Sequence, residues 1–384
     1  MRSVRKKDNF KLAAFLRSTI LGLLVVSACF GAALRYMTEF YASPLPVSSV
    51  KNTGVIVENT AENTAGNSKE AGVTNENTES MASDNTNSET EKSVFVSTLS
   101  EEELKLQPET DTNYASDIKK VSLTEDDINK LKDFSYLKSN FYIVDQRTDL
   151  LESDINVDEF LNMDLTIDKS IGGPKVLIFH THSSEMYADS DPSKGVEEGI
   201  WGVGEELKNI LENKYGIEVL HDTGRYDVVD GKNQILGAYE RMEPAIRKIL
   251  EQYPTIELVI DMHRDGVNED VRLVDDVNGK TCAKIMFFNG LCRLNENGVL
   301  SDITSLPNEY LKENLALSFN LQMTANKLFP DFTRKIYINA YRYSLHMKPK
   351  SLLIEVGAQT NTKQEAKNSM EPLADVLSRV ILSE

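Results

Sequence analysis

The chain has 384 residues, 40% of them hydrophobic, which is enough for one large buried core with residues left over. Its formal net charge of −18 argues against nucleic acid as a partner, because phosphate binding needs a basic surface. The three cysteines are too few for a disulfide framework, so Cys282 and Cys292 could equally well be bridged or reduced.

The N-terminus predicts a membrane anchor. Six basic residues lie within positions 1–17, and an uncharged, largely apolar run of 17 residues follows at 18–34. Such a run is at the short end for a membrane-spanning helix, and the preceding charge places the N-terminus in the cytoplasm. We therefore predict a cytoplasmic tail over 1–17, a transmembrane anchor over 18–37, and a single-pass protein of the cell membrane whose remaining chain is extracytoplasmic. A cleaved signal peptide, or lipidation at Cys29, would export the same domain.

A polar linker is predicted to follow over residues 38–115. Asn, Thr, Ser and Glu dominate this segment from about residue 51, and aromatic residues are nearly absent. Such a composition cannot bury enough apolar surface to offset its chain entropy. We expect a flexible tether here, then an N-terminal extension over 116–170 and the catalytic domain over 171–384.

Beyond the linker, strands are predicted to alternate with helices. Ser122 to Glu125 forms a capping box for a first helix that reaches about Leu137. Pro244 predicts a kink or break in a later helix. The alternation predicts an α/β domain with a largely parallel sheet flanked by helices, in which ligands bind at the carboxyl ends of the strands. The expected strands are 176–179, 217–220, 256–262 and 352–356, the expected helices are 203–211, 234–250, 310–328 and 363–381, and a hairpin pairs 271–274 with 283–288.

Histidines gather where two of these strands end. His180 and His182 follow the first strand, and His263 ends the third. His182 and Glu185 are three residues apart, so in a turn their side chains can point the same way and chelate one ion. Two histidines and one carboxylate, with a fourth position open, form a catalytic zinc arrangement. A single histidine of this kind is more often a hydrogen-bonded turn or core residue, and for the set as a whole a zinc site and purely structural histidines stand as two equal alternatives.

Four further polar residues could assist such a site. Asp261 could orient the His263 imidazole, and Arg264 could bind a substrate carboxylate or form only a solvated ion pair. His180 is expected to point to the opposite side from His182. It would then either support the metal ligands from behind or face the substrate. His346 could face the cleft and donate a hydrogen bond to the transition state.

Glu355 is a carboxylate inside an apolar strand pattern, Leu352-Leu-Ile-Glu-Val-Gly357. A buried carboxylate is costly unless it is paired, bound to metal or functional. Desolvation would raise the pKa of Glu355 and suit it to proton transfer. An edge strand with this side chain in solvent is the alternative.

Taken together, these motifs resemble the stage II sporulation protein P family of spore-forming bacteria. The resemblance runs from about Tyr142 to the C-terminus, although Tyr341 to His346 is looser than the family pattern. It is carried by Pro174-Lys-Val-Leu-Ile-Phe-His-Thr-His-x-x-Glu185, Leu220-His-Asp222, Ile260-Asp-Met-His-Arg-Asp265, Ala283-Lys-Ile-Met-Phe287 and Leu352-Leu-Ile-Glu-Val-Gly357.

The resemblance implies a fold similar to the zinc N-acetylmuramoyl-L-alanine amidases. It also implies cleavage of the amide between N-acetylmuramic acid and the stem L-alanine, with peptide cross-links as further substrates. The implied role is wall remodelling during engulfment of the forespore, alongside sporulation proteins D and M. By carry-over, His182, Glu185 and His263 would bind zinc, with His180 a possible replacement for His182, and Glu355 would be the general base and acid.

Two other functions remain compatible with the sequence. A zinc carboxypeptidase-like peptidase shares the His-x-x-Glu spacing. A non-catalytic anchored scaffold that recruits wall enzymes would not need the complete set of His182, Glu185, His263 and Glu355.

Overall fold

The computed structural model describes residues 118–382. The predicted tail (1–17), anchor (18–37) and linker (38–115) all lie outside the described residues. Within residues 118–382, none of the helices combines the length and apolar character of a membrane span.

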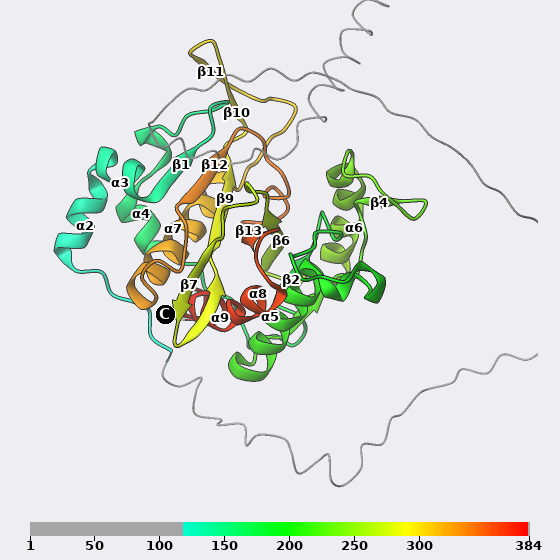
Figure 1. The fold of residues 1–384 in the computed structure, drawn as a ribbon. Coiled ribbons are helices and arrows are strands. Elements are labelled where there is room, and N and C mark those ends of the chain that lie inside the picture. Colours follow the sequence, from blue (N-terminus) through cyan, green and yellow to red (C-terminus); the bar gives the residue numbers. More distant parts are fainter. Residues whose placement is uncertain (1–117, 383–384) are drawn as a thin grey trace, which may run out of the picture. The chain divides into compact units, whose positions relative to one another are not determined.

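A seven-stranded sheet forms the centre of the described part (Figure 1), in the order β1-β12-β9-β13-β6-β2-β3. Neighbouring strands are parallel throughout, except that β9 runs antiparallel to β13. The domain is therefore a mixed α/β fold with a mostly parallel sheet flanked by helices, as predicted. The strands are β1 (Tyr142–Val144), β12 (Ile336–Asn339), β9 (Ile285–Gly290), β13 (Lys350–Ala358), β6 (Leu258–Asp265), β2 (Val176–Phe179) and β3 (Val219–His221).

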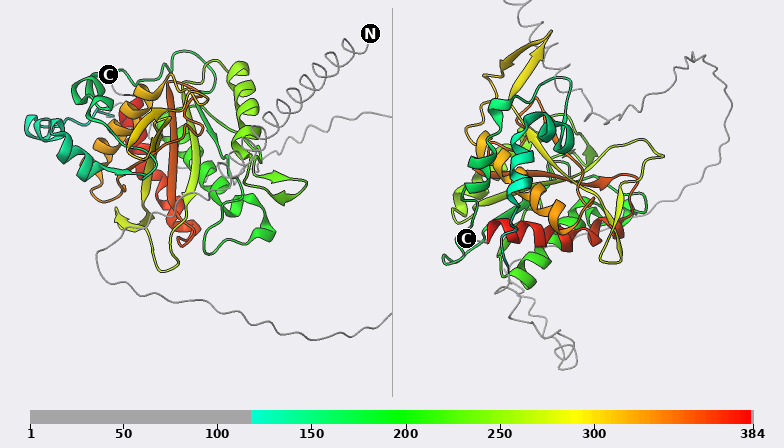
Figure 2. Two further views of the ribbon diagram at one scale, coloured as in Figure 1. Left: turned by 90° about the horizontal axis from the view of Figure 1, so that it is seen from above. Right: turned by 90° about the vertical axis from the view of Figure 1, so that its left-hand side faces the viewer.

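Alternation along the buried strands supplies both faces of the sheet with apolar side chains. In β2, Val176 and Ile178 join the larger core cluster, whereas Leu177 and Phe179 join a second cluster. The first face is covered by α5 (Ile200–Tyr215), α7 (Leu311–Leu328) and α9 (Met370–Ile381), and the second by α6 (Ala238–Gln252) and the loop 340–349. Figure 2 shows these layers from two further directions.

The remaining elements decorate this core. The N-terminal segment joins the sheet itself, because β1 pairs with β12 in parallel. A hairpin, β10 (Arg293–Glu296) with β11 (Val299–Asp302), projects at one end of the described unit (Figure 1). The others are α2 (Glu125–Lys132), α3 (Phe134–Phe141), α4 (Val157–Asn162), α8 (Lys363–Asn368), and the short pairs β4 (Val228–Val229) with β5 (Lys232–Asn233) and β7 (Val274–Val277) with β8 (Lys280–Ala283).

The first predicted helix is two helices. The cap is Thr124, whose side chain accepts from the backbone of Asp127, so the predicted box at Ser122 is wrong by two residues. The helix ends at Asp133, which adopts an extended backbone and whose carboxylate caps α3 by accepting from Tyr136 N–H at 3.1 Å. Asp133 therefore divides the predicted helix in two, because its short carboxylate side chain caps the N-terminus of the second helix.

The last predicted helix is also divided, at Ser369 between α8 and α9. Pro372 lies in the first turn of α9 and has no N–H to donate to the carbonyl of Asn368, so one continuous helix is disfavoured there. The Ser369 hydroxyl instead donates to Ala283 O at 2.7 Å. α8 begins with a capping box, in which the Thr362 side chain accepts from Glu365 N–H and the Glu365 side chain accepts from the Thr362 N–H.

Pro244 does not break α6, which runs from Ala238 to Gln252 with the proline inside it. One helical hydrogen bond is lost, but Met242 and Ile246 on either side are fully buried against β2 and β6. Tertiary packing outweighs the local cost of the proline.

The predicted hairpin has a different register. The two-residue turn Asn278-Gly279 pairs Val274–Val277 with Lys280–Ala283, and the apolar segment after it becomes β9 of the main sheet. The Asn-Gly turn determines the register, since it favours a tight hairpin immediately on either side of itself. Cys282 and Cys292 are both buried and unbridged.

Candidate metal centre

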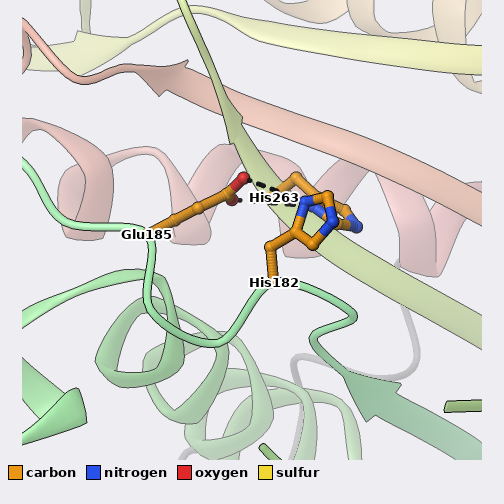
Figure 3. Close-up of side chains that lie close together, drawn as sticks. All are labelled: His182, Glu185 and His263. Carbon is orange, nitrogen blue, oxygen red and sulfur yellow. Dashed lines mark ion pairs between the residues drawn. The ribbon is translucent and has the colours of Figure 1, made fainter. Parts of the chain in front are cut away.

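The end of β2 brings His182 and Glu185 together. The strand stops at Phe179, and residues 181–184 form a turn in which Glu185 N–H donates to His182 O at 3.3 Å. This tight turn places His182 Nδ1 3.4 Å from Glu185 Oε1 (Figure 3). His182 and Glu185, three residues apart, therefore point the same way, as predicted, because a turn directly follows the buried strand.

His263 reaches the same point from β6. Its Nδ1 lies 3.6 Å from Glu185 Oε2 (Figure 3), and one donor atom each from His182, Glu185 and His263 fall within 4.8 Å of one another. All three side chains are buried. Within residues 118–382 this is the one group of three or more such ligands that meets this criterion.

Residues behind the cluster hold two of its members in place. Asp261 Oδ1 lies 2.8 Å from His263 Nε2, and its carboxylate accepts from the Thr181 hydroxyl at 2.8 Å and the Thr181 N–H at 3.0 Å. The backbone N–H of Arg264 donates to Glu185 Oε2 at 2.9 Å. The guanidinium of Arg264 donates to the carbonyls of Met186 and Asp265. It therefore holds the backbone next to Glu185 in place.

Asp227 is a support that the sequence did not indicate. It is fully buried, and its carboxylate accepts from the Ser183 hydroxyl at 2.8 Å and the Ser184 N–H at 2.9 Å. It therefore fixes the turn that carries His182 and Glu185. Its position in an irregular segment, far from any recognisable motif, left no pattern by which to find it.

The electrostatics of the cluster favour a cation. Burial opposes ionisation, but the charges of Asp261 and Glu185 hold the pKa of His263 well above its usual range. Despite its own burial, Glu185 has a lowered pKa because of His263 and His182. The buried Nδ1 of His263 makes no hydrogen bond within residues 118–382. Two imidazoles and a carboxylate that face one another without saturating their hydrogen bonds fit the ligand set of Zn²⁺.

Glu355 lies beside this cluster on the neighbouring strand. In the parallel pairing of β13 with β6 it stands opposite His263, and it is only 4% exposed. Its Oε2 makes no hydrogen bond within the described residues. Burial and the nearby Asp265 carboxylate raise the pKa of Glu355 to about 8. A bound cation would lower this pKa again, so that the carboxylate could accept a proton near neutral pH.

His180 faces the other side of the sheet. In an extended strand His180 and His182 would share a face; they separate because the strand ends at Phe179 and a turn begins. His180 is fully buried, with Nδ1 2.9 Å from Met262 O and Nε2 2.9 Å from His221 Nε2. Its nitrogens are thus occupied away from the cluster, and burial with the neighbouring His221 lowers its pKa to about 3.

His221 continues this buried chain. Its Nδ1 lies 2.8 Å from Glu205 Oε2, and its ring stacks on Trp201 at 4.6 Å between centroids. Gly204 of α5 makes room for the pair, since a Cβ there would lie 2.7 Å from His180 Nε2. This second group of histidines is structural in its contacts.

His346 is placed outside the cluster. Its Nδ1 lies 3.1 Å from Tyr343 O, and its Nε2 lies 3.1 Å from Glu243 Oε1 of α6. Tyr239, one turn earlier on α6, reaches the cluster instead: its ring contacts that of His182 with centroids 5.7 Å apart. Sequence reasoning missed Tyr239, because a tyrosine in the first turn of an amphipathic helix carries no chemical signature.

The fold and the site define a mixed α/β domain with a candidate metal centre at the carboxyl ends of its strands, next to a buried carboxylate. The family model of stage II sporulation protein P (SpoIIP) matches residues 36–378, and the chain belongs to this family. The family predicted from the motifs is therefore confirmed, and membership supports a peptidoglycan hydrolase role in sporulation.

Among the solved structures with a partial likeness to this chain are two amidases. The CwlD amidase from Clostridioides difficile, solved in complex with the GerS lipoprotein, is 13% identical; the match covers 54% of this chain and 96% of that one, with a TM-score of 0.32. The N-acetylmuramyl-L-alanine amidase Ami1 from Mycobacterium smegmatis is 10% identical, with coverages of 54% and 96% and a TM-score of 0.31. No curated protein sequence matches the chain.

Proposed function

We propose that this chain is a zinc-dependent N-acetylmuramoyl-L-alanine amidase that cuts the amide between N-acetylmuramic acid and the L-alanine of the stem peptide. The observation that carries the proposal is the meeting of His182, Glu185 and His263 beside the buried Glu355, in a chain of a sporulation family. Cleavage of peptide cross-links is the second activity proposed for the same site.

His182, Glu185 and His263 would hold the zinc. The ion would act as a Lewis acid toward the scissile carbonyl and lower the pKa of the attacking water. Asp261 keeps the His263 ring oriented through Nε2, which leaves Nδ1 facing Glu185. The Arg264 N–H fixes one oxygen of the Glu185 carboxylate.

Glu355 would move the proton. In the ionised form it accepts a proton from the water that adds to the carbonyl carbon. It then donates this proton to the amide nitrogen as the carbon–nitrogen bond breaks, so that a carboxylic acid and a free amine are released. Its burial excludes bulk water from competing with this transfer.

The setting of this activity follows the sequence predictions for residues outside the described part. We propose that an anchor over 18–37 and a linker over 38–115 hold the domain on the extracytoplasmic side of the cell membrane, at the membrane that engulfs the forespore. Sporulation proteins D and M are the proposed partners, with peptidoglycan as the substrate.

Digestion of purified sacculi tests the proposal. Full-length protein in detergent is incubated with sacculi, with and without a chelator, and the products are identified by mass spectrometry. Chelator-sensitive release of intact stem peptides from glycan supports the amidase. Release of single C-terminal residues would instead identify a carboxypeptidase, and no release would favour a non-catalytic scaffold.

A variant of Glu355 tests the assigned proton carrier. Glu355→Gln keeps the size of the side chain but cannot accept a proton, so we expect zinc content to be unchanged and kcat to fall by about 10²- to 10⁴-fold. Metal analysis and steady-state rates on soluble muropeptides measure both. Retained turnover in this variant would overturn the role of Glu355.

A further inference from the structure

The first turn of α6 presents a tyrosine to the candidate metal centre. The Tyr239 ring meets the His182 ring edge to face, with centroids 5.7 Å apart and planes at 77°. Alternation places Asp261, His263 and Glu355 on the same face of the sheet, the one that α6 covers. Tyr239 therefore stands on the side of the centre toward which these side chains point.

Polar contacts fix this part of α6. Arg241 donates from Nε to Tyr226 O at 2.6 Å and from Nη1 to Leu236 O at 3.1 Å, which ties the helix start to the segment before it. Glu243, on the same helical face as Tyr239, binds Arg342 at 3.0 Å and lies 3.1 Å from His346 Nε2. The helix and the loop 340–349 thus form one braced unit.

A strained residue in that loop packs on Tyr239. Tyr343 has φ of +50°, a left-handed conformation that is rare for a bulky side chain. Its ring lies 5.5 Å from that of Tyr239 and 4.8 Å from that of Phe288. Strain of this kind persists only when the surroundings hold it, and it gathers at functional sites.

The hydroxyl of Tyr239 has no internal partner. It makes no hydrogen bond within residues 118–382, although the ring itself is held on two sides. A phenol is protonated at neutral pH, so this hydroxyl can donate a hydrogen bond to a bound substrate.

We propose that the Tyr239 hydroxyl is a catalytic residue that donates a hydrogen bond to the carbonyl oxygen of the scissile amide as negative charge develops on it. Tyr343 is a positioning residue that fixes the Tyr239 ring against His182. This inference rests on the proposed amidase activity and deepens it. It also assigns to Tyr239 the role of transition-state donor that the sequence suggested for His346.

The test removes one hydroxyl and keeps the ring. In full-length protein, Tyr239→Phe should lower kcat on a soluble muropeptide by about 10²- to 10³-fold, the usual effect of losing one such donor. KM and the zinc dissociation constant should change little. The matched control is Tyr337→Phe, which loses a hydroxyl bound to Asp145 at 2.8 Å in the same aromatic group and should retain kcat.

A binding measurement gives a readout that does not depend on turnover. A muramyl phosphonate, in which a tetrahedral anionic phosphorus group replaces the scissile carbonyl, should bind Tyr239→Phe more weakly by about the same factor as kcat falls. Tyr343→Ala should lower kcat, and combining it with Tyr239→Phe should produce little further loss, because both act through one hydroxyl.

The outcomes separate the two hypotheses. If unmodified protein binds zinc and releases stem peptides while Tyr239→Phe keeps full kcat and full phosphonate affinity, the phenol is not the donor and the amidase stands. Loss of zinc in Tyr239→Phe would make Tyr239 a support of His182 only and would also overturn the inference. If the unmodified protein releases no stem peptide, the proposed function itself has failed.

Discussion

Two groups of histidines lie at the same edge of the sheet. One forms the candidate metal centre, and the other is a hydrogen-bonded structural group. On the face under α6, His182 and His263 meet Glu185 at 3.4 and 3.6 Å. On the face under α5, His180 and His221 hydrogen-bond at 2.9 Å, and Glu205 completes the chain at 2.8 Å. Each group contains two imidazoles and a carboxylate, so composition does not distinguish them.

The difference lies in which donor atoms remain available. In the second group each ring nitrogen is already paired with a neighbour: Met262 O, the other histidine or the carboxylate. In the first group, His263 Nδ1 makes no hydrogen bond within residues 118–382 and faces Glu185. Hydrogen-bond saturation, more than residue type, therefore separates a structural cluster from a candidate metal centre.

The largest expected effect comes from removing a member of the first group. His263→Ala should lower zinc affinity by more than about 100-fold and abolish release of stem peptides, since even residues behind metal ligands are worth about 10- to 100-fold. The corresponding change in the second group, His180→Ala, should leave the zinc stoichiometry at that of the parent. Metal analysis after dialysis measures both; equal zinc loss in the two variants would erase the distinction.

An intermediate effect is expected from crowding the second group. Gly204→Ala introduces a Cβ that would lie 2.7 Å from His180 Nε2 and 3.0 Å from His221 Nε2, both of them held by hydrogen bonds. We expect the free energy of unfolding to fall by about 1–3 kcal/mol, the usual cost of overpacking. Denaturant unfolding tests this, with Gly172→Ala as control because nothing lies within 4 Å of a Cβ there. An unchanged midpoint for Gly204→Ala would mean that the histidine pair can yield.

The smallest effect is a pH dependence of stability. Burial raises the pKa of the Glu205 carboxyl, but the hydrogen bond from His221 outweighs burial, so the pKa of Glu205 is lowered in the folded protein. A carboxylate with a lowered pKa contributes stability above its unfolded-state pKa, and this contribution is lost as the pH falls through the folded-state value. Glu205→Gln should therefore be less stable than the parent at pH 6, and the gap should narrow toward pH 3. Unfolding curves at both pH values measure it, and a gap that widens on acidification would contradict the assignment.

Much of the architecture could be predicted from the sequence. The strand 176–179 has the predicted ends, and the helix 310–328 differs by one residue at its start, because long apolar or periodic runs flanked by breakers carry strong local signals. Two short elements, the strand β12 and the β10–β11 hairpin, were not predicted from the sequence. Only pairing with β9 and β1 makes a four-residue segment such as Ile336–Asn339 a strand.

For the site, the sequence by itself determined the local part. The three-residue spacing of His182 and Glu185 after a buried strand, and the strand positions of His263 and Glu355, are properties of short segments, and side-chain periodicity is enough to interpret them. Tertiary structure alone decided which histidine joined the cluster. The strand ends at Phe179, and Gly204 admits His180 to the opposite face.

Tertiary structure also decided what surrounds the cluster. Asp227 and Tyr239 come from segments 42 and more residues beyond Glu185 in the sequence, and they reach the centre only because the segment after β3 and the helix α6 fold back over that face of the sheet. A single sequence records spacing along the chain, whereas the support and the donor depend on contacts between distant segments, which packing of the whole core selects.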